Sequence, residues 1–246
     1  MTSDELNQVL GFLWPGLWVT IELSVISFVV TVVLAAGLSA AAVSRHVPVR
    51  WATRAWIELL RSIPILALMT FFYFGLGPVV AKIGISAFVL AVAALSLSSS
   101  AYLAEVYRGA INSVPRSQWS AAESLGMPHG MALRLIIVPQ VIPPLVPSTL
   151  NALISVIKFS SLASLITVSE LTLQATQAVS ETFLPMQCYL LLGLFYAVII
   201  VPMIYVCKWV EHWTKRRYGL VAAHVPPPAT DPYLMADELE QVGRAA

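Results

Sequence analysis

Ionisable side chains within long apolar runs are the first candidates for chemistry in this sequence. Glu58 and Arg61 are three residues apart, and so are Glu105 and Arg108. On a helix, side chains at this spacing share one face, and we interpret both pairs as structural ion pairs rather than gating groups. Lys158 ends another apolar run. Its ammonium group either meets a solute carboxylate or extends to the outer headgroups, and both interpretations stay open.

Patterns for enzymatic catalysis are missing from the sequence. The phosphate-binding pattern G-x-x-x-x-G-K-[ST] does not occur, so this chain is not expected to bind ATP. Its four histidines show no metal-ligand spacing, and we expect no metal or other cofactor on this chain. The basic residues are spread over several loops as a membrane topology requires, so we expect no nucleic-acid partner.

An unusually apolar chain must position these groups. Hydrophobic residues make up 58% of the sequence, charged residues 11%, and the mean hydropathy is +0.80. A soluble domain carries about a quarter charged residues, whereas a helix that crosses a bilayer needs about 20 mostly apolar residues. Five runs qualify: Leu17–Val43, Ile57–Leu76, Ser86–Tyr107, Leu135–Ile157 and Gln187–Val210. We therefore predict an all-α integral membrane protein with about five transmembrane helices.

Small polar residues recur within two of these runs. They are Thr20, Ser24, Ser27 and the run 96–100. They either line a polar path or let the helices pack closely, and close packing is the simpler interpretation.

The last third of the chain holds a shorter apolar stretch and two cysteines. Leu162–Leu173 is too short to span a bilayer, and we predict a re-entrant or interfacial segment there. Glu170 and Glu181 are expected to be solvated in the outer connection. Cys188 and Cys207 fall in the last run, too far apart along one helix to bridge, and are predicted to be buried free thiols.

The distribution of basic residues predicts the orientation. Alternate connections, the end of the last run and the segment after it carry the cations Arg45, Arg50, Arg54, Arg108, Arg116, Arg134, Lys208, Lys215, Arg216 and Arg217. Lys82 alone falls in a loop on the other side. Because basic loops remain in the cytoplasm, we predict the N-terminus outside and the C-terminus inside.

The same pattern divides the chain into three parts. Residues 1–13 form a predicted periplasmic segment whose Asp4 and Glu5, without any cation, do not match the positive region of a cleaved signal peptide. Residues 14–213 form one transmembrane domain without an internal boundary. Residues 219–246 contain four prolines among scattered acids, a composition that predicts a disordered cytoplasmic tail.

The longest connection between runs, residues 108–134, predicts a short cytoplasmic helix. Pro115 suits its first turn, where a missing N–H costs nothing. Gly126, followed by Pro128, suits its end, since glycine adopts the left-handed conformation of a helix terminus.

The small residues of this predicted helix suggest a contact surface. Ala121 and Ala122 would let another backbone approach closely, and Trp119 and Leu125 offer apolar anchors. By these physical arguments the helix either lies along the membrane interface or docks a soluble partner.

Several blocks of this sequence resemble a known family. Ser120-Ala121-Ala122, Gly126, Ile137 and Pro139-Gln140 are similar to the EAA loop of binding-protein-dependent ABC importer permeases. Residues 58–64, 102–111 and 161–164 resemble the polar amino acid branch of that family, which includes histidine, glutamine, arginine and opine transporters. The likeness extends from about Trp14 to Trp213.

The resemblance implies a permease of the type I ABC importer fold in a bacterial inner membrane. Its loop would form the coupling helix, which contacts the cytoplasmic ATPase subunits through Gln118, Trp119, Ser120, Ala121, Ala122 and Gly126. The candidate substrate pathway comprises Lys158, Ser160, Ser161, Glu58 and Arg61. The implied partners are those ATPase subunits, which would hold ATP and Mg²⁺, a second identical or different permease subunit, a periplasmic substrate-binding protein and membrane lipid.

Two positions depart from the family pattern. Ser120 stands where the family usually has a glutamate, so a salt bridge from that acid cannot form. Phe159-Ser160 follows Lys158 where the family often has Asp-Thr. Phe159 therefore stands where the family often has an aspartate, and the loss of this acid would alter which ligand the protein prefers.

Two alternatives belong to other classes of protein. An ion-driven secondary carrier would transport solute without an ATPase and would respond to an ion gradient. A non-transporting membrane module would recruit a cytoplasmic partner through the loop without any solute flux. The ordered blocks favour the ATP-driven permease over both.

Overall fold

The structure is a computed structural model that describes residues 3–80, 82 and 84–218. The predicted disordered tail, residues 219–246, lies outside the described residues. Every regular element in the described part is helical, and no strand occurs there. In chain order the elements are α1 (Ser3–Ala42), α2 (Val47–Ser62), α3 (Ile65–Thr70), η1 (Phe71–Leu76), α4 (Gly77–Val80), α5 (Ala87–Ser113), α6 (Arg116–Ser124), α7 (His129–Ala132), η3 (Leu133–Ile137), α8 (Val138–Phe159), η4 (Ser160–Ile166), α9 (Leu171–Thr182) and α10 (Pro185–Tyr218).

The predicted all-α membrane architecture is confirmed. Among the described residues, four helical segments are long and apolar enough to cross a membrane: Ser3–Ala42, Ala87–Ser113, His129–Ile166 and Pro185–Thr214. A bent pair, Val47–Ser62 with Ile65–Leu76, raises the number to five when it is counted as one span.

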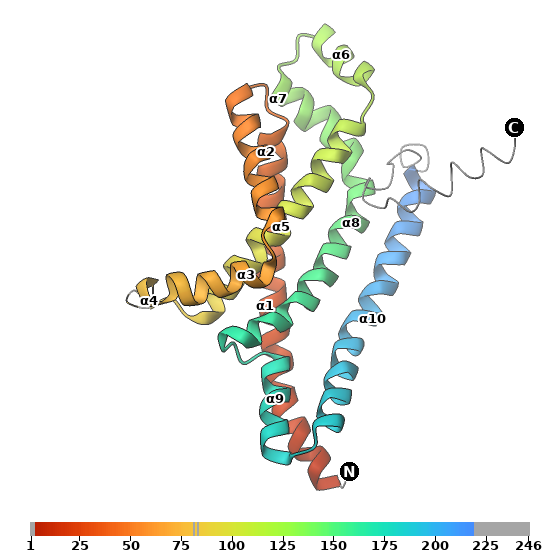
Figure 1. Cartoon of the computed structure of the whole chain (residues 1–246). Helices are drawn as coiled ribbons and strands as arrows, with labels where there is room; N and C mark the ends of the chain where they lie inside the picture. The colour runs from red at the N-terminus through yellow and green to blue at the C-terminus, as the bar shows by residue number, and fades with distance from the viewer. Residues whose placement is uncertain (1–2, 81, 83, 219–246) are drawn as a thin grey trace, which may run out of the picture.

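The second span is not the straight helix that the run Ile57–Leu76 predicts. The chain bends by 96° between its two halves, and Figure 1 shows α3, η1 and α4 projecting sideways from the bundle. Ile63 at the break is extended, with φ −90° and ψ 122°. Pro64 disfavours a helical conformation in the preceding residue and lacks the N–H that would continue the helix. Hydropathy alone does not detect this break.

Close packing of small side chains joins α1 to α5. Thr20, Ser24, Ser27 and Thr31 are buried on α1, and the Ser96 hydroxyl of α5 donates to the Ser27 carbonyl oxygen at 3.1 Å. Small residues let membrane helices approach each other closely. Thr20, Ser24, Ser27 and Ser96 therefore follow the packing interpretation, whereas Ser98 and Ser99 of the same run line a cavity between α2, α5 and α8.

At one end of the bundle α9 lies against the first half of α1 (Figure 1). A Cβ atom added to Gly16 of α1 would lie 3.0 Å from Leu171 Cα and 2.9 Å from Gln174 Cγ. The Leu171 N–H donates to the Thr20 hydroxyl oxygen at 3.0 Å. A small residue at Gly16 therefore lets α9 dock on α1.

The two ends of the bundle differ in what they present. The start of α1 and all of α9 lie at one end, whereas α6, α7, the start of α2 and the end of α10 lie at the other (Figure 1).

The predicted free thiols are confirmed within this bundle, since Cys188 and Cys207 are both unpaired and buried.

Candidate functional site

The connection between α5 and α8 contains the predicted short helix. α6 begins after Pro115 and ends in a left-handed turn at Gly126, whose φ is +70°. The Met127 N–H donates to the Ala122 carbonyl oxygen at 3.1 Å, and the Gly126 N–H donates to that of Glu123 at 2.9 Å. These two bonds make the Schellman motif that satisfies the last carbonyl groups of a helix. The signal at Gly126 is thus confirmed, and Pro115 stands one position earlier than predicted, at the N-cap rather than in the first turn.

Two contacts tie α6 and α7 to the connection between α1 and α2. Arg45 Nη2 lies 2.7 Å from Glu123 Oε1, across 78 positions of sequence. The His129 ring stacks on the Trp119 indole with ring centroids 4.6 Å apart, and its Nε2 donates to the Val43 carbonyl oxygen at 3.2 Å. The sequence offered no local signal for Arg45, Glu123 or His129, because each partner is distant along the chain.

The candidate coupling residues divide between two sides of α6. Gln118, Ser120 and Ala121 are exposed. Ala122 is fully buried, and Trp119 is half-buried against His129. The two inward residues hold α6 to its own chain, so only the exposed ones are available to a partner.

A cavity of about 650 Å³ lies at the bend between α2 and α3, and we call it the polar cavity because serine, asparagine and arginine side chains interrupt its mostly apolar surface. Three segments distant in sequence, from α2–α3, α5 and α8, supply its walls. Its lining residues are Arg61, Ser62, Ile63, Pro64, Ile65, Ser98, Ser99, Tyr102, Leu103, Val106, Ser148, Asn151, Ala152, Ser155 and Phe159. Hydroxyl and amide groups alternate here with apolar surface, an arrangement typical of sites that hold small polar ligands.

Arg61 is the cation of this cavity. Its Nη1 lies 3.3 Å from Glu58 Oε1, and its guanidinium carbon lies 5.5 Å from the centre of the Tyr102 ring. The Tyr102 hydroxyl donates to the Arg61 carbonyl oxygen at 3.2 Å. Arg61 Nε is buried and has no hydrogen-bond partner among the described residues. The guanidinium therefore carries a buried donor that no described residue satisfies.

Both predicted ion pairs form. Besides the pair of Glu58 with Arg61, Arg108 makes a two-pronged contact with Glu105 on α5. A smaller cavity of about 120 Å³ brings Glu58, Glu105 and Arg108 together beside Arg54. The acids of α2 and α5 thus face the same basic neighbours.

The other candidate pathway residues do not line the polar cavity. Lys158 is exposed at the end of α8. Ser160 is fully buried and donates to the Ile157 carbonyl oxygen at 2.8 Å, and the Ser161 hydroxyl donates to that of Lys158 at 2.8 Å. Of this segment, Phe159 borders the cavity.

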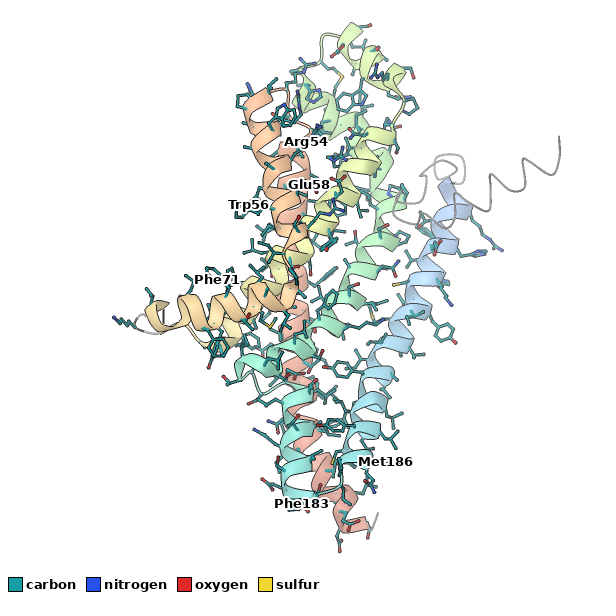
Figure 2. The ribbon with its side chains drawn as sticks, in the orientation of Figure 1. Arg54, Trp56, Glu58, Phe71, Phe183 and Met186 are labelled. Atoms are coloured by element: carbon teal, nitrogen blue, oxygen red, sulfur yellow. The ribbon has the colours of Figure 1, made fainter. Side chains whose placement is uncertain are left out.

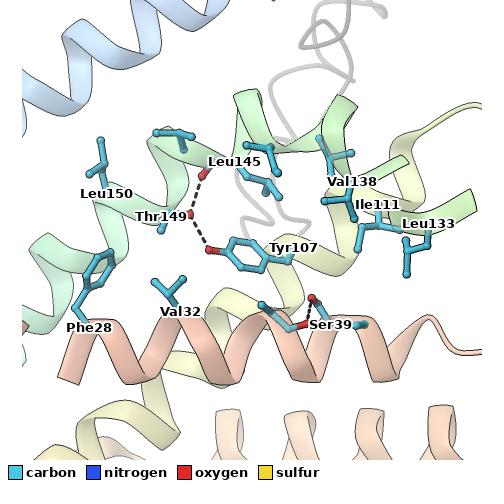
Figure 3. A pocket seen from close by; sticks show the side chains of 15 residues that line it. Phe28, Val32, Ser39, Tyr107, Ile111, Leu133, Val138, Leu145, Thr149 and Leu150 are labelled. Atoms are coloured by element: carbon cyan, nitrogen blue, oxygen red, sulfur yellow. Dashed lines mark hydrogen bonds between the residues drawn. The ribbon is translucent and has the colours of Figure 1, made fainter. Parts of the chain in front are cut away.

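A second cavity, of about 540 Å³, is almost entirely apolar. Figure 3 shows it between α1, the end of α5 and α8, with Phe28 and Leu150 at one side and Leu133 at the other. The hydroxyls of Tyr107 and Thr149 lie 2.9 Å apart and hydrogen-bond to each other. Because its few polar groups are already paired, this cavity does not suit a polar solute.

Glu170 is a further residue whose environment the sequence did not predict. The expectation that it is solvated is wrong, because its side chain is fully buried at the start of α9. Its carboxylate accepts the N–H groups of Thr172 at 2.9 Å and Leu173 at 3.0 Å, and the Tyr196 hydroxyl of α10 donates to it at 3.1 Å. Burial raises the pKa of this carboxyl to about 7, although these hydrogen bonds favour the charged form.

The helical spans, the tethered helix α6 and the polar cavity define a membrane transport subunit. Over residues 33–218 the chain matches the family described as binding-protein-dependent transport system inner membrane component. The chain belongs to this family, and it is accordingly a multi-pass inner-membrane transport subunit. ATP hydrolysis in such importers lies in separate subunits, and this membership sets aside the ion-driven carrier and the non-transporting module.

Curated relatives agree over most of the chain. The probable amino-acid ABC transporter permease protein YckA of Bacillus subtilis is 38% identical over 74% of this chain and 79% of its own length. The arginine transport system permease protein ArtQ of the same organism is 30% identical, over 83% of this chain and 93% of its own. The octopine transport system permease protein OccM of Rhizobium meliloti is 32% identical, over 84% of this chain and 91% of its own.

Solved structures share the fold. An amino acid ABC transporter crystallised with histidines matches with a TM-score of 0.75 and 31% identity, covering 87% of this chain and 100% of that one. The MetNI methionine ABC transporter in an inward-facing conformation matches with a TM-score of 0.66 and 14% identity, covering 87% and 99% of the two chains. The fold is therefore that of type I ABC importer permeases.

Proposed function

We propose that this permease subunit carries a polar amino acid or a related compound through the cavity around Arg61. The relatives support this class of solute, since they are named for the transport of arginine and octopine. The observation that carries the proposal is the position of Arg61, whose buried Nε has no hydrogen-bond partner among the described residues, in the lining of a cavity that also carries serine hydroxyls and the Asn151 amide. A guanidinium matches the geometry of a carboxylate, which amino acids share.

The partners follow from the two ends of the bundle. The end with α6 and the basic residues faces the cytoplasm, and the N-terminal end of α1 faces the periplasm. Cytoplasmic ATPase subunits, which hold ATP and Mg²⁺, dock on the exposed side of α6 that carries Gln118, Ala121 and Leu125. A second permease subunit completes the path, and a periplasmic binding protein delivers the solute.

ATP-dependent uptake by the assembled importer in proteoliposomes tests this proposal. Labelled arginine, glutamine and octopine serve as solutes, with Arg61→Gln, Arg61→Lys and the control Arg134→Gln, which alters an exposed cation outside the cavity. Removing a charged hydrogen bond costs about 1.5–3 kcal/mol, so Arg61→Gln should lower uptake at limiting solute by at least about tenfold. Arg61→Lys should keep part of the wild-type uptake, and the control Arg134→Gln should keep all of it.

The same preparation shows which results contradict the proposal. Full uptake by Arg61→Gln, with the ATPase still co-purifying, would remove Arg61 from solute recognition. Uptake that needs an ion gradient and no ATPase would contradict the coupled mechanism itself.

A further inference from the structure

A third cavity lies on the membrane-domain side of α6, next to the apolar cavity, with which it shares Ile111. Its volume is about 740 Å³, and basic residues dominate it. The lining residues are Val43, Arg45, Arg50, Arg54, Ile111, Asn112, Val114, Arg116, Trp119, Ser120, Glu123 and His129. Its arginines come from the α1–α2 connection, from α2 and from the start of α6, so the fold gathers them from distant parts of the sequence.

We propose that this cavity binds the phosphate headgroup of an anionic phospholipid of the cytoplasmic leaflet. A guanidinium presents several N–H donors in a planar fork that fits phosphate oxygens in pairs. Basic pockets at the cytoplasmic ends of membrane helices bind anionic headgroups by this chemistry. This placement rests on the proposed orientation, in which the end of the bundle with α6 faces the cytoplasm.

The charges of the lining leave room for an added anion. Glu123 is the single carboxylate among the lining residues, and it pairs with Arg45. Arg54 also borders the smaller cavity that holds acids of α2 and α5. Arg50 donates to the Ser44 carbonyl oxygen at 3.1 Å, a neutral acceptor. No carboxylate among the lining residues pairs with Arg50 or Arg116. Both arginines would therefore stabilise an anion in the cavity.

The depth of the cavity favours a lipid over a soluble anion. Trp51 and Trp56 of α2 are exposed, and tryptophans concentrate at the headgroup level of membranes. Figure 2 shows Arg54 and Glu58 on the side of α2 that faces α5, with Trp56 on the opposite side. Residues adjacent in sequence differ by about 1.5 Å along a helix axis, so the arginines of α2 lie at the depth that these tryptophans mark.

A headgroup in this position would add a second link between two regions that Arg45 and Glu123 already hold together. Its phosphate would bridge Arg50 of α2 and Arg116 at the first turn of α6. The ATPase contact is assigned to the opposite, exposed side of α6, with Gln118 and Leu125. Apart from Ser120, which lines the cavity, the exposed residues proposed to contact the ATPase lie away from it. Lipid and ATPase therefore bind largely different sides of α6, and the lipid stabilises the position of the helix.

Native mass spectrometry of the full chain in detergent tests the proposal without requiring transport. The probes are dioleoyl-phosphatidylglycerol and, as the zwitterionic counterpart, dioleoyl-phosphatidylcholine. We expect the wild type to retain the anionic lipid preferentially. Since each arginine near an anionic surface adds a similar increment, Arg50→Gln with Arg116→Gln should weaken its binding by about 30-fold. Arg50→Lys with Arg116→Lys, which keeps the charge, should retain most of it.

A matched control separates this site from general surface charge. Arg134→Gln with Lys208→Gln removes two exposed cations that do not line the cavity, and it should leave the preference unchanged. Thermal unfolding of each variant shows that it is folded.

Three results would overturn the proposal. Equal loss of anionic lipid in the control would make the binding a property of the whole basic surface. Displacement of the lipid by excess inorganic phosphate would make the cavity a site for a free anion. In the assembled importer, normal lipid binding by the Arg50–Arg116 double variant together with loss of the ATPase would assign the arginines to acidic groups of that partner. Because lipid binding itself is measured without transport, on the chain alone in the first comparison, failure of solute transport does not affect the test.

Discussion

Arg61 and Glu170 show how burial determines what a charged side chain can do. Arg61 keeps a carboxylate partner and stacks near Tyr102, yet its Nε remains without a partner among the described residues. Glu170 is wholly buried, and its oxygens are filled by N–H and O–H donors of α9 and α10. The first arrangement suits reversible recognition of a ligand, and the second suits a structural link.

The buried Glu170 should make stability depend on pH. Its folded-state pKa is raised from 4.5 to about 7, so the folded protein binds the proton more tightly than the unfolded chain does. The stabilisation is complete below pH 4.5 and is lost as the pH rises through 7, a total of about 3 kcal/mol. Glu170→Gln, which stays neutral and keeps an acceptor for the N–H groups, should flatten this dependence.

Unfolding midpoints of wild type and Glu170→Gln between pH 5 and 8 measure the effect. The wild type should become less stable than the variant towards the alkaline end. Parallel curves for the two proteins would show that Glu170 does not titrate in this range.

At the scale of the elements, glycines decide how two helices end or meet. Gly126 ends α6 with a positive φ, and a Cβ there would meet no atom within 4 Å. Gly16 has ordinary helical geometry but lies against α9, where a Cβ would approach backbone. Replacement should therefore be costly for conformational reasons at Gly126 and for steric reasons at Gly16.

Gly16→Ala should destabilise the contact between α1 and α9 by about 1–3 kcal/mol, because Leu171 Cα cannot move aside as a flexible side chain can. Gly37→Ala is the matched control on the same helix, since a Cβ there meets nothing within 4 Å. Alanine is the better helix former, so the control should be neutral or stabilising. Thermal unfolding in detergent compares the two, and equal shifts would contradict the close approach at Gly16.

Gly126→Ala should lower stability by about 1 kcal/mol, because alanine resists the left-handed conformation. Gly126→Asn should cost less, as asparagine tolerates that conformation. The measurement is thermal unfolding together with co-purification of the ATPase. An alanine variant that loses more ATPase than the asparagine variant would link the helix end to docking, whereas identical behaviour would contradict the importance of the left-handed turn.

On the scale of the whole molecule, the bundle separates two functional ends. α9 and the turn to α10 lie at the end that holds the start of α1, and α6 lies at the other (Figure 1). Phe183 and Met186 mark the first end in Figure 2. The described basic residues that are predicted to be cytoplasmic lie in two places. They are near α6, on the neighbouring ends of α2, α5 and η3, or they are at the end of α10.

Cysteine labelling in intact spheroplasts should establish the orientation. Met186→Cys is exposed at the end assigned to the periplasm, and Leu125→Cys at the end assigned to the cytoplasm. An impermeant maleimide should label the first directly and the second only after permeabilisation. The native Cys188 and Cys207 are buried, so the wild type should give a low background. The reverse pattern would invert the orientation.

Much of the architecture could be predicted because it depends on neighbouring residues. The five apolar runs follow from the length of hydrocarbon that a helix must cross. The ion pairs Glu58–Arg61 and Glu105–Arg108 follow from helical spacing. Helix α6 follows from Pro115 and Gly126 at its ends. The bend at Ile63–Pro64 was missed although its cause is local, since average hydropathy does not distinguish a bent span from a straight one.

The sequence by itself determined the class of protein, its spans and its short helix, because hydropathy and helix termini act over a few turns. Only the tertiary structure decided that Glu170 is buried, that Ala122 faces inward, and that Arg45 reaches Glu123. It also decided that the polar cavity includes Arg61 and Phe159 but not Lys158. These outcomes depend on which distant segments pack together, and the free energy of such contacts is not encoded in any short window of sequence.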